Sequence, residues 1–229
     1  MTTPQPPVLT LLAAWSGGQG APALTWYGPA GERVELSERV LANWVTKAMN
    51  LLADEADAAP GTVVALDLPM HWRSLVWALA AWGCGATVRL PREETTTDAD
   101  VWVSDAPEPA TAPVVIAIAL PALARQVADL PEGAIDGAAE LMAQPDVLLT
   151  PPDWDPQAIA LGEIRHAELA RTEAERAGEN RFLVLAGASA DGLRTCLGLW
   201  AAGASVVLVG DPDADLERIG NQEGAQRLP

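Results

Sequence analysis

Apolar residues recur with helical spacing in residues 35–54, where polar residues separate them at nearly every turn. Side chains three or four positions apart share one face of a helix, so this pattern predicts an amphipathic helix with one buried face. Ser37 stands where an N-cap residue would accept a hydrogen bond from the first turn. The apolar face consists of Leu36, Val40, Leu41, Trp44, Val45, Ala48, Leu51 and Leu52.

A short apolar run follows the turn signal Pro60-Gly61. Residues 63–66 are apolar on both faces, which is typical of a strand in a buried parallel sheet. After a loop containing Pro69 and His71, residues 72–82 predict a second helix, and residues 86–90 predict the next strand.

The middle of the chain alternates in the same way. Residues 101–103, 114–119 and 146–149 predict strands, and residues 123–128, 135–142 and 161–177 predict helices, the last one long and charged. Residues 91–98 and the proline-rich residues 150–158 predict loops, because proline removes backbone donors and disrupts regular structure.

The end of the chain repeats the pattern of residues 63–90. The strands 63–66 and 182–185 are each followed by a helix, a glycine (Gly85 or Gly203) and a second strand. A glycine after a helix permits the left-handed turn that returns the chain to the sheet. A shift of 118 residues matches Leu75 with Leu193, Leu79 with Leu197, Trp82 with Trp200, Gly85 with Gly203, Ala86 with Ala204, Val88 with Val206 and Leu90 with Leu208.

Two strand-helix-strand units of this kind predict an α/β fold. We expect mainly parallel sheets in two pseudo-symmetric lobes with flanking helices, at about residues 14–105 and 110–210. Residues 211–229 predict one short helix and a polar tail, the tail covering 216–229.

Composition excludes several classes of partner. The 229 residues include 31 acidic and 14 basic side chains, for a net charge of −17, which disfavours nucleic acid and anionic membranes. No apolar run is long enough to span a bilayer, and residues 1–7 lack a basic start typical of a signal peptide, so we expect a cytoplasmic protein. The two cysteines, Cys84 and Cys196, lie in apolar stretches and predict buried free thiols.

Several segments resemble the N-terminal part of the adenylate-forming enzymes, the acyl-CoA synthetase and AMP-binding family. The resemblance rests on Trp26-Tyr27-Gly28, on the run from Pro60-Gly61 to Pro69, on Trp82-Gly83-Cys84-Gly85-Ala86, and on Ala201 to Leu208. It covers nearly the whole chain, yet the chain covers under about half of that multidomain family. The resemblance implies a single truncated AMP-binding-like domain, 1–229, from a shortened and uncharacterised actinobacterial group.

The phosphate loop of that family has no counterpart here. The family carries Thr-Ser-Gly-Thr-Thr-Gly-x-Pro-Lys-Gly, whose amides and lysine hold the phosphates of ATP. In residues 150–158, between the expected strand 146–149 and the expected helix 161–177, three prolines and two aspartates replace it. Lys47, the only lysine, matches no functional lysine of the family. The sequence therefore predicts that the chain does not activate carboxylates with ATP.

For the other candidate groups we prefer an ordinary structural or surface role to a catalytic or ligand-binding one. Asp153, Asp155 and Glu163 match no metal-site spacing and predict a solvated acidic loop. A histidine base, His71 or His166, could in principle activate a serine, Ser74 or Ser189. Neither serine stands in a nucleophile elbow, so we expect these residues at ordinary surface positions. Residues 187–192 lie between a strand and a helix, where α/β proteins bind ligands, but a tight turn is the preferred interpretation. We therefore assign no catalytic, cofactor-binding or metal residue and no cofactor.

Nine tryptophans are many for this length. Trp72, Trp77, Trp82 and Trp200 fall on predicted helices, so we expect most of the tryptophans in the core, although several together can line a flat apolar site. The leading hypothesis is a binding or interaction protein on a degenerate adenylate-forming scaffold. The alternatives are a binding site or a weak enzyme for an acyl, aromatic or nucleotide-like molecule between the lobes, and a homo-oligomer or partner subunit that uses a tryptophan-rich face.

Overall fold

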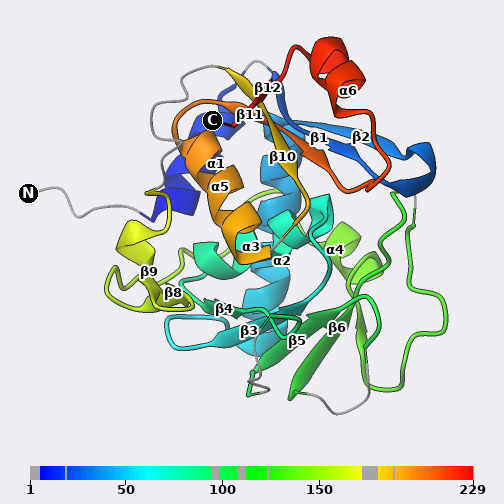
Figure 1. The fold of residues 1–229 in the computed structure, drawn as a ribbon. Coiled ribbons are helices and arrows are strands. Elements are labelled where there is room, and N and C mark those ends of the chain that lie inside the picture. Colours follow the sequence, from blue (N-terminus) through cyan, green and yellow to red (C-terminus); the bar gives the residue numbers. More distant parts are fainter. Residues whose placement is uncertain are drawn as a thin grey trace, which may run out of the picture.

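Two mainly parallel sheets, joined by helices packed between them, make up the fold (Figure 1). The computed structural model describes residues 6–18, 20–93, 98–107, 112–122, 124–171, 180–187 and 189–228. The fold is α/β, as the alternation of strand and helix patterns predicts.

Sheet A contains strands from both ends of the chain. Its order is β12-β10-β11-β1-β2, and all its pairs are parallel except the antiparallel pair of β1 and β2. The strands are β1 (Pro22–Tyr27), β2 (Arg33–Ser37), β10 (Arg181–Leu185), β11 (Ser205–Val209) and β12 (Gln226–Arg227).

Sheet B is built from the middle of the chain. Its order is β7-β6-β5-β3-β4-β8-β9, and only the pair of β8 and β9 is antiparallel. The strands are β3 (Val63–Asp67), β4 (Thr87–Arg89), β5 (Val101–Ser104), β6 (Val114–Ala117), β7 (Ile135–Asp136), β8 (Ile159–Leu161) and β9 (Ile164–Arg165).

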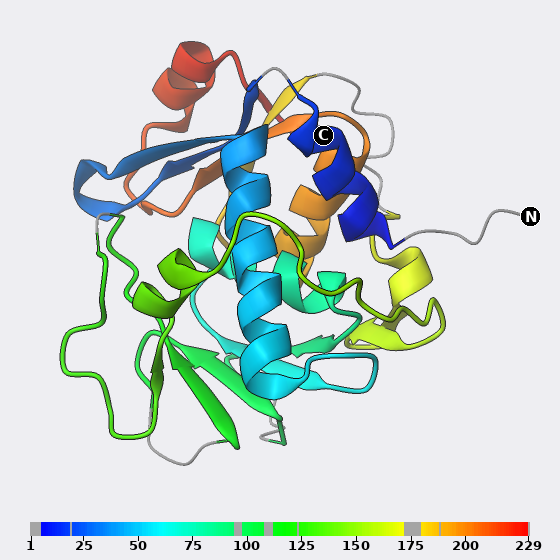
Figure 2. The same cartoon turned by 180° about the vertical axis from the view of Figure 1, so that it is seen from behind.

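Four helices supply most of the helical side chains of one large apolar core that reaches both sheets. They are α1 (Pro7–Ser16), α2 (Glu38–Ala56), α3 (Trp72–Gly83) and α5 (Ser189–Ala201). The long helix α2 runs from sheet A to sheet B (Figure 2). The short helix α4 (Ala139–Ala143) packs on α2, and α6 (Leu216–Glu223) covers a second apolar cluster on sheet A. None of the helices in the described residues is both long and apolar enough to cross a membrane.

The predicted helix over residues 35–54 is confirmed with a shifted start. Residues 35–37 pair with β1 as part of β2, and α2 begins at Glu38. The Ser37 hydroxyl accepts a hydrogen bond from the Val40 amide at 3.3 Å, so Ser37 caps the helix as expected.

The internal repeat is confirmed as two strand-helix-strand units, one in each sheet. The unit β3-α3-β4 lies in sheet B and the unit β10-α5-β11 in sheet A, and in both the two strands are parallel neighbours. Gly85 and Gly203 follow the helices with φ of +80° and +84°, the left-handed conformation that the turn requires. The predicted lobes at 14–105 and 110–210 do not coincide with the sheets, because β1 and β2 belong to the same sheet as β10 and β11.

Predictions between residues 123 and 171 are largely wrong, because side chains and neighbouring strands take up the backbone groups there. In place of a helix over 123–128, the described residues are irregular, and the Val127 amide donates to the Asp136 carboxylate at 2.7 Å. The predicted helix over 135–142 is shorter than expected: Ile135 pairs with β6, and α4 begins at Ala139.

The predicted strand over 146–149 and the predicted long helix over 161–177 are also wrong. Residues 145–149 bond to the side chain of Asn50 on α2 instead of to a sheet. Residues 159–165 form the β8–β9 hairpin with Gly162 at φ +56°, followed by a 3-10 turn, η2 (His166–Glu168); residues 172–179 lie outside the described part.

Candidate functional site

A cleft of about 560 Å³ lies where the loops of the two sheets meet, and we call it the inter-sheet cleft. Its volume is within the range of small-molecule sites. Most of its wall is apolar, and among the described residues the only titratable side chains on it are those of Glu32 and His71. The lining residues are Trp26, Pro29, Ala30, Gly31, Glu32, Pro69, Met70, His71, Leu120, Pro121 and Gly210.

The cleft lies at the carboxyl ends of parallel strands from both sheets. Gly210 directly follows β11, and Trp26 lies near the end of β1. Residues 69–71 follow β3, and residues 120–121 follow β6. Ligands of open α/β sheets bind outside this edge of the sheet, where successive loops diverge and leave a crevice.

Glu32 lies on the connection between β1 and β2 and holds two sides of the cleft together. Its carboxylate accepts the Trp26 indole Nε1–H at 2.8 Å through Oε2 and the Ala122 amide at 2.9 Å through Oε1. These bonds connect sheet A to the loop after β6, so the carboxylate is held in place at the wall of the cleft.

His71 caps helix α3 and is buried against the cleft. Its Nδ1 accepts the Arg73 amide at 3.1 Å, so the proton of the neutral ring is on Nε2. Burial lowers the pKa of His71 to about 4; the nearby Glu32 charge raises it in part, and the Arg73 charge lowers it further. His71 is therefore neutral at physiological pH. Its Nε2 lies 4.0 Å from Glu32 Oε2, and its ring meets the Trp26 ring edge to face at 4.6 Å.

Arg73 is not among the described residues that line the cleft. It stacks over the Trp72 ring at 4.4 Å and also contacts the Trp44 ring at 5.5 Å. Its Nη2 donates to the Pro121 carbonyl at 3.3 Å. Burial lowers the pKa of Arg73 to about 10, and it remains charged at neutral pH. Arg73 thus acts on Glu32 only through its longer-range field.

Gly210 permits the close approach of Trp26 to the chain after β11. A Cβ atom at Gly210 would meet the Trp26 ring at 2.1 Å, so the ring or the backbone after β11 would have to shift. Trp26 is 3% exposed, so its ring has little space into which it could move. The shape of the cleft therefore depends on glycine at this position.

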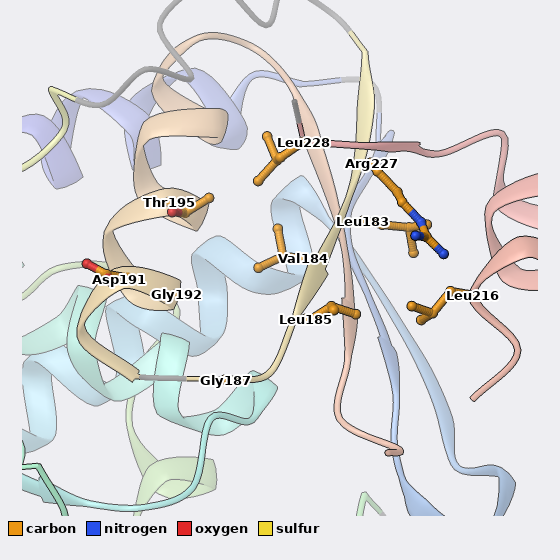
Figure 3. A pocket seen from close by; sticks show the side chains of 10 residues that line it. All are labelled: Leu183, Val184, Leu185, Gly187, Asp191, Gly192, Thr195, Leu216, Arg227 and Leu228. Carbon is orange, nitrogen blue, oxygen red and sulfur yellow. The ribbon is translucent and has the colours of Figure 1, made fainter. Parts of the chain in front are cut away.

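A second pocket of about 430 Å³ surrounds the free edge of β10 (Figure 3). Leu183, Leu216 and Arg227 lie on one side of the strand, whereas Val184, Thr195 and Leu228 lie on the other. Strand β12 pairs only with Phe182 and Leu183, which leaves the rest of this edge open. This geometry is that of a sheet edge between two apolar surfaces, and it is less suited than the inter-sheet cleft to enclosing a small molecule.

The helix α5 that borders this pocket already has an internal partner at its start. The Glu93 carboxylate accepts the Ser189 amide and, at 3.4 Å, the Ala190 amide. A carboxylate at a helix N-terminus occupies the position where an external anion would bind. Of the predicted loop at 187–192, Gly187, Asp191 and Gly192 line the pocket, and residue 188 lies outside the described part.

Residues 150–158 do not reach the inter-sheet cleft. The Asp153 carbonyl lies at Gly85, beside Pro60, which places the loop at the edge of sheet B where the parallel strands begin. The expected strand before the loop and the expected helix after it are both absent in the described residues. The connection between β8 and β9 is the two-residue turn Gly162-Glu163, so no phosphate-binding loop is formed there either.

Lys47, the only lysine, fastens the segment before this loop to α2. It donates to the Gln144 carbonyl and pairs with Asp146 at 2.9 Å. Its side chain is 17% exposed. Asn50, one turn later, holds residues 145–149 through three further hydrogen bonds, so Lys47 has a structural role.

The histidines and serines singled out in the sequence do not form a catalytic pair. Ser74 donates to the Pro69 carbonyl, while the Nδ1 of His71 is engaged by a backbone amide. His166 lies at the opposite edge of sheet B, near Ala86, and burial lowers its pKa. Both histidines are buried, so the prediction that they lie at the surface is wrong.

The described acidic residues and the two cysteines form no cluster with metal-ligand geometry. Within the described residues, no group of three His, Cys, Asp or Glu side chains is close enough to hold a metal ion. Cys84 and Cys196 are buried free thiols, as predicted; burial raises the pKa of Cys84 to about 12 and also raises the pKa of Cys196.

The tryptophans belong to the core, as the sequence indicates. Seven of the nine are buried, and Trp44 and Trp154 are partly buried. The indoles of Trp82 and Trp200 donate to the Ala160 and Ala23 carbonyls at 3.0 and 2.9 Å. No tryptophan is exposed, so the alternative of a tryptophan-rich surface is wrong.

Sequence reasoning missed the residues that define the cleft. Trp26 belongs to a motif that the family resemblance attributes to the scaffold, and Glu32 and Gly210 stand in no recognisable motif. The Gly-Pro-Ala-Gly-Glu run at 28–32 could have indicated a turn after a strand that ends in Trp26. Its contact with the loop after β6 depends on tertiary structure alone.

Comparison with solved structures places this fold among the acyl-CoA synthetases. The acyl-CoA synthetase of Brucella canis matches with a TM-score of 0.75 at 20% identity, over 97% of this chain and 46% of that one. The acetoacetyl-CoA synthetase of Streptomyces lividans matches with a TM-score of 0.71 at 16% identity, over 96% and 41%. The amide bond synthetase McbA of Marinactinospora thermotolerans matches with a TM-score of 0.64 at 21% identity, over 94% and 47%. The chain thus spans under half the length of these structures.

A sequence relative is much closer in identity. A protein of Mycobacterium tuberculosis described as a TIGR03089 family protein is 34% identical over 212 residues, which cover 84% of this chain and 84% of the relative. No protein-family model matches the chain.

Proposed function

The chain belongs to the TIGR03089 family, and from this premise we propose that it binds a small apolar molecule in the inter-sheet cleft and does not activate carboxylates with ATP. The scaffold is that of the N-terminal domain of acyl-CoA synthetases. A shared scaffold does not imply a shared reaction, because the reaction depends on the residues of the site.

The charge of the cleft is the observation that carries this proposal. Of the eleven described residues that line it, one is a carboxylate, Glu32, and none is a lysine or an arginine. His71 is neutral because burial lowers the pKa of its imidazole to about 4. A triphosphate would enter a cleft with no basic side chain to neutralise it, in a chain of net charge −17.

Three other positions at which phosphate could be held support the same proposal. The loop at 150–158 carries prolines and aspartates and lies at the opposite edge of sheet B. The single lysine is bound to residues 144 and 146. The start of α5 is occupied by Glu93.

A paired binding experiment tests this function. We expect millimolar ATP with magnesium to leave the unfolding temperature unchanged, whereas 2-phenylethanol, a small ring compound of suitable size, shifts the Trp26 indole NMR signal saturably. A ligand at about 100 times its Kd would add about 2.7 kcal/mol to the free energy of unfolding, so ATP binding would be easily seen. Saturable stabilisation by ATP, or no response of Trp26 to phenyl compounds, would refute the proposal.

A second candidate function, association with a second copy of this chain, is favoured by an exposed apolar segment. Met142, Val147 and Leu149 are 60%, 66% and 66% exposed, and Leu148 is 37% exposed. Lys47 and Asn50 hold this segment on α2, so its apolar side chains are displayed from an ordered backbone. Grouped apolar side chains of this kind are typical of protein contacts.

Sedimentation analysis of the wild type and of Leu149→Glu over a wide concentration range tests this second function. We expect concentration-dependent association of the wild type that the charged variant abolishes. A wild type that stays monomeric throughout would exclude self-association through this segment.

A further inference from the structure

We infer that the inter-sheet cleft selects a cationic amine on an apolar body, with the Glu32 carboxylate as the counter-ion. This inference rests on the proposed function, because it specifies the chemistry of the molecule bound at the same site. Such a ligand has the opposite charge to the carboxylate substrates that the resembled family of adenylate-forming enzymes activates.

Glu32 retains the capacity to bind a donor from a ligand. A carboxylate offers about four lone-pair positions, and the Trp26 indole and the Ala122 amide occupy one on each oxygen. The Glu32 side chain is 26% exposed at the wall of the cleft. Because these two bonds fix the carboxylate, an incoming ammonium group meets an acceptor that is already oriented.

The surroundings leave the Glu32 charge available to a ligand. The only other titratable group on the described wall, His71, is neutral and carries its N–H on Nε2, which lies 4.0 Å from Glu32 Oε2, beyond hydrogen-bond distance. Arg73 contributes a field at longer range, but its guanidinium is stacked on Trp72 and bonded to the Pro121 carbonyl. No basic side chain therefore competes with a ligand for direct contact with Glu32 in the cleft as described.

The rest of the wall suits an apolar body beside the charge. Met70 and Leu120 supply aliphatic surface, and the Trp26 indole supplies an aromatic ring next to the carboxylate. Aromatic rings attract ammonium groups through their quadrupole, which favours a cation over a neutral group of the same shape. A carboxylate ligand would be repelled by Glu32, because both groups are negative and the site is partly desolvated.

Three probes with the same phenylalkyl body distinguish these charges: 2-phenylethylamine, 2-phenylethanol and 3-phenylpropionate. Binding is followed by the indole Nε1–H signal of Trp26 in ¹⁵N-correlated NMR spectra, assigned from its loss in Trp26→Phe. We expect the amine to bind about ten-fold more tightly than the alcohol, and the carboxylate to bind most weakly.

Two matched variants assign the preference to Glu32. Glu32→Gln should abolish the advantage of the amine over the alcohol, because it removes the charge and keeps nearly the same shape. Glu35→Gln removes an equal charge from the neighbouring strand β2, outside the cleft, and should keep the advantage. Circular dichroism of both variants checks that the fold is retained.

The outcomes separate this inference from the proposed function. If the alcohol or the carboxylate binds as tightly as the amine, or if Glu32→Gln keeps the preference, the inference is wrong while binding in the cleft stands. If none of the three probes shifts Trp26 saturably, the proposed function fails and the inference fails with it.

Discussion

Lowering the pH from neutral towards 4 should weaken this fold steadily, because His71 takes up a proton at a higher pH in the unfolded chain than in the folded one. In the folded protein the ring is 5% exposed, and its Nδ1 accepts the Arg73 amide. Protonation would turn this acceptor into a donor facing another donor, and it would place a charge in an apolar setting. In the unfolded chain the same ring titrates near its ordinary pKa of 6.5.

The sign and size of the effect follow from these two pKa values. Between pH 6.5 and about 4 the unfolded chain binds a proton that the folded chain does not, so the free energy of unfolding falls as the pH falls. Above pH 6.5 the ring is neutral in both states and contributes no pH dependence. The separation of the pKa values corresponds to about 3 kcal/mol, a large share of the stability of an ordinary domain.

Urea unfolding of the wild type and of His71→Asn, followed by tryptophan fluorescence over this pH range, measures the effect. Asparagine is a good N-cap and keeps a side-chain oxygen for the Arg73 amide, but it does not titrate. The carboxylates contribute equally to the pH dependence of unfolding in both proteins, so their contribution cancels when the two free energies of unfolding are subtracted. We expect the wild type to lose about 3 kcal/mol relative to the variant between about pH 7 and pH 4.

Parallel stability curves for the two proteins would refute this reasoning. They would mean that His71 titrates at the same pH in both states, and that its burial does not exclude the charged form. An NMR titration of the His71 ring signals in the folded protein gives an independent check, because it reports the folded-state pKa directly.

Three further substitutions test the packing around the site. Gly210→Ala should lower the free energy of unfolding by about 1–3 kcal/mol and abolish probe binding, because its Cβ overlaps the Trp26 ring. Gly187→Ala is the control and should have neither effect, because a Cβ at Gly187 has open space around it. Urea unfolding measures the stability of both variants, and NMR titration measures their probe binding. Asn50→Ala should cost about 2–3 kcal/mol and speed hydrogen exchange of the amides in residues 145–149, since three hydrogen bonds are lost. Glu223→Gln should cost about 2 kcal/mol in urea unfolding, because its buried carboxylate pairs with two arginines; a loss below a few tenths of a kcal/mol would contradict that account.

The repeated strand-helix-strand units could be predicted because their signals are local. The strand at 63–66 is apolar on both faces, and the glycine after each helix marks a turn that only a residue tolerant of positive φ adopts. The helix at 38–56 likewise carries its apolar face and its Ser37 cap within its own sequence. In these elements local preference and tertiary packing agree.

Residues 123–171 could not be predicted because partners far away in the sequence determine their structure. Residues 145–149 have the composition of a strand, yet they bond to Asn50, about a hundred positions earlier. The hairpin at 159–165 is held where Val88 pairs with Leu161 and where Thr87 donates to the Ile159 carbonyl at 2.7 Å. A charged sequence of helical composition became a hairpin there because an exposed sheet edge provided backbone partners.

The site was hidden for the same reason. Glu32 in the sequence is one of 31 acidic residues, and only the fold places it between the indole of Trp26 and the loop after β6. The absence of the phosphate loop could be inferred from the sequence because that loop is a run of consecutive residues. The cleft, in contrast, is assembled from four separate segments.

The pairing of β1 with β11 has a consequence for how the protein is made. Leu24 lies opposite Val206, so the centre of sheet A cannot close until residue 206 has left the ribosome, 182 residues after Leu24. The core of sheet B uses strands between residues 63 and 117, which emerge early and lie close together in sequence. Local pairings form before distant ones, and chains fold as they are synthesised, at about 5–20 residues per second. Strand β1 therefore remains without its β11 partner for roughly 10 to 35 seconds, a period in which a nascent chain is open to misassembly and to chaperone binding.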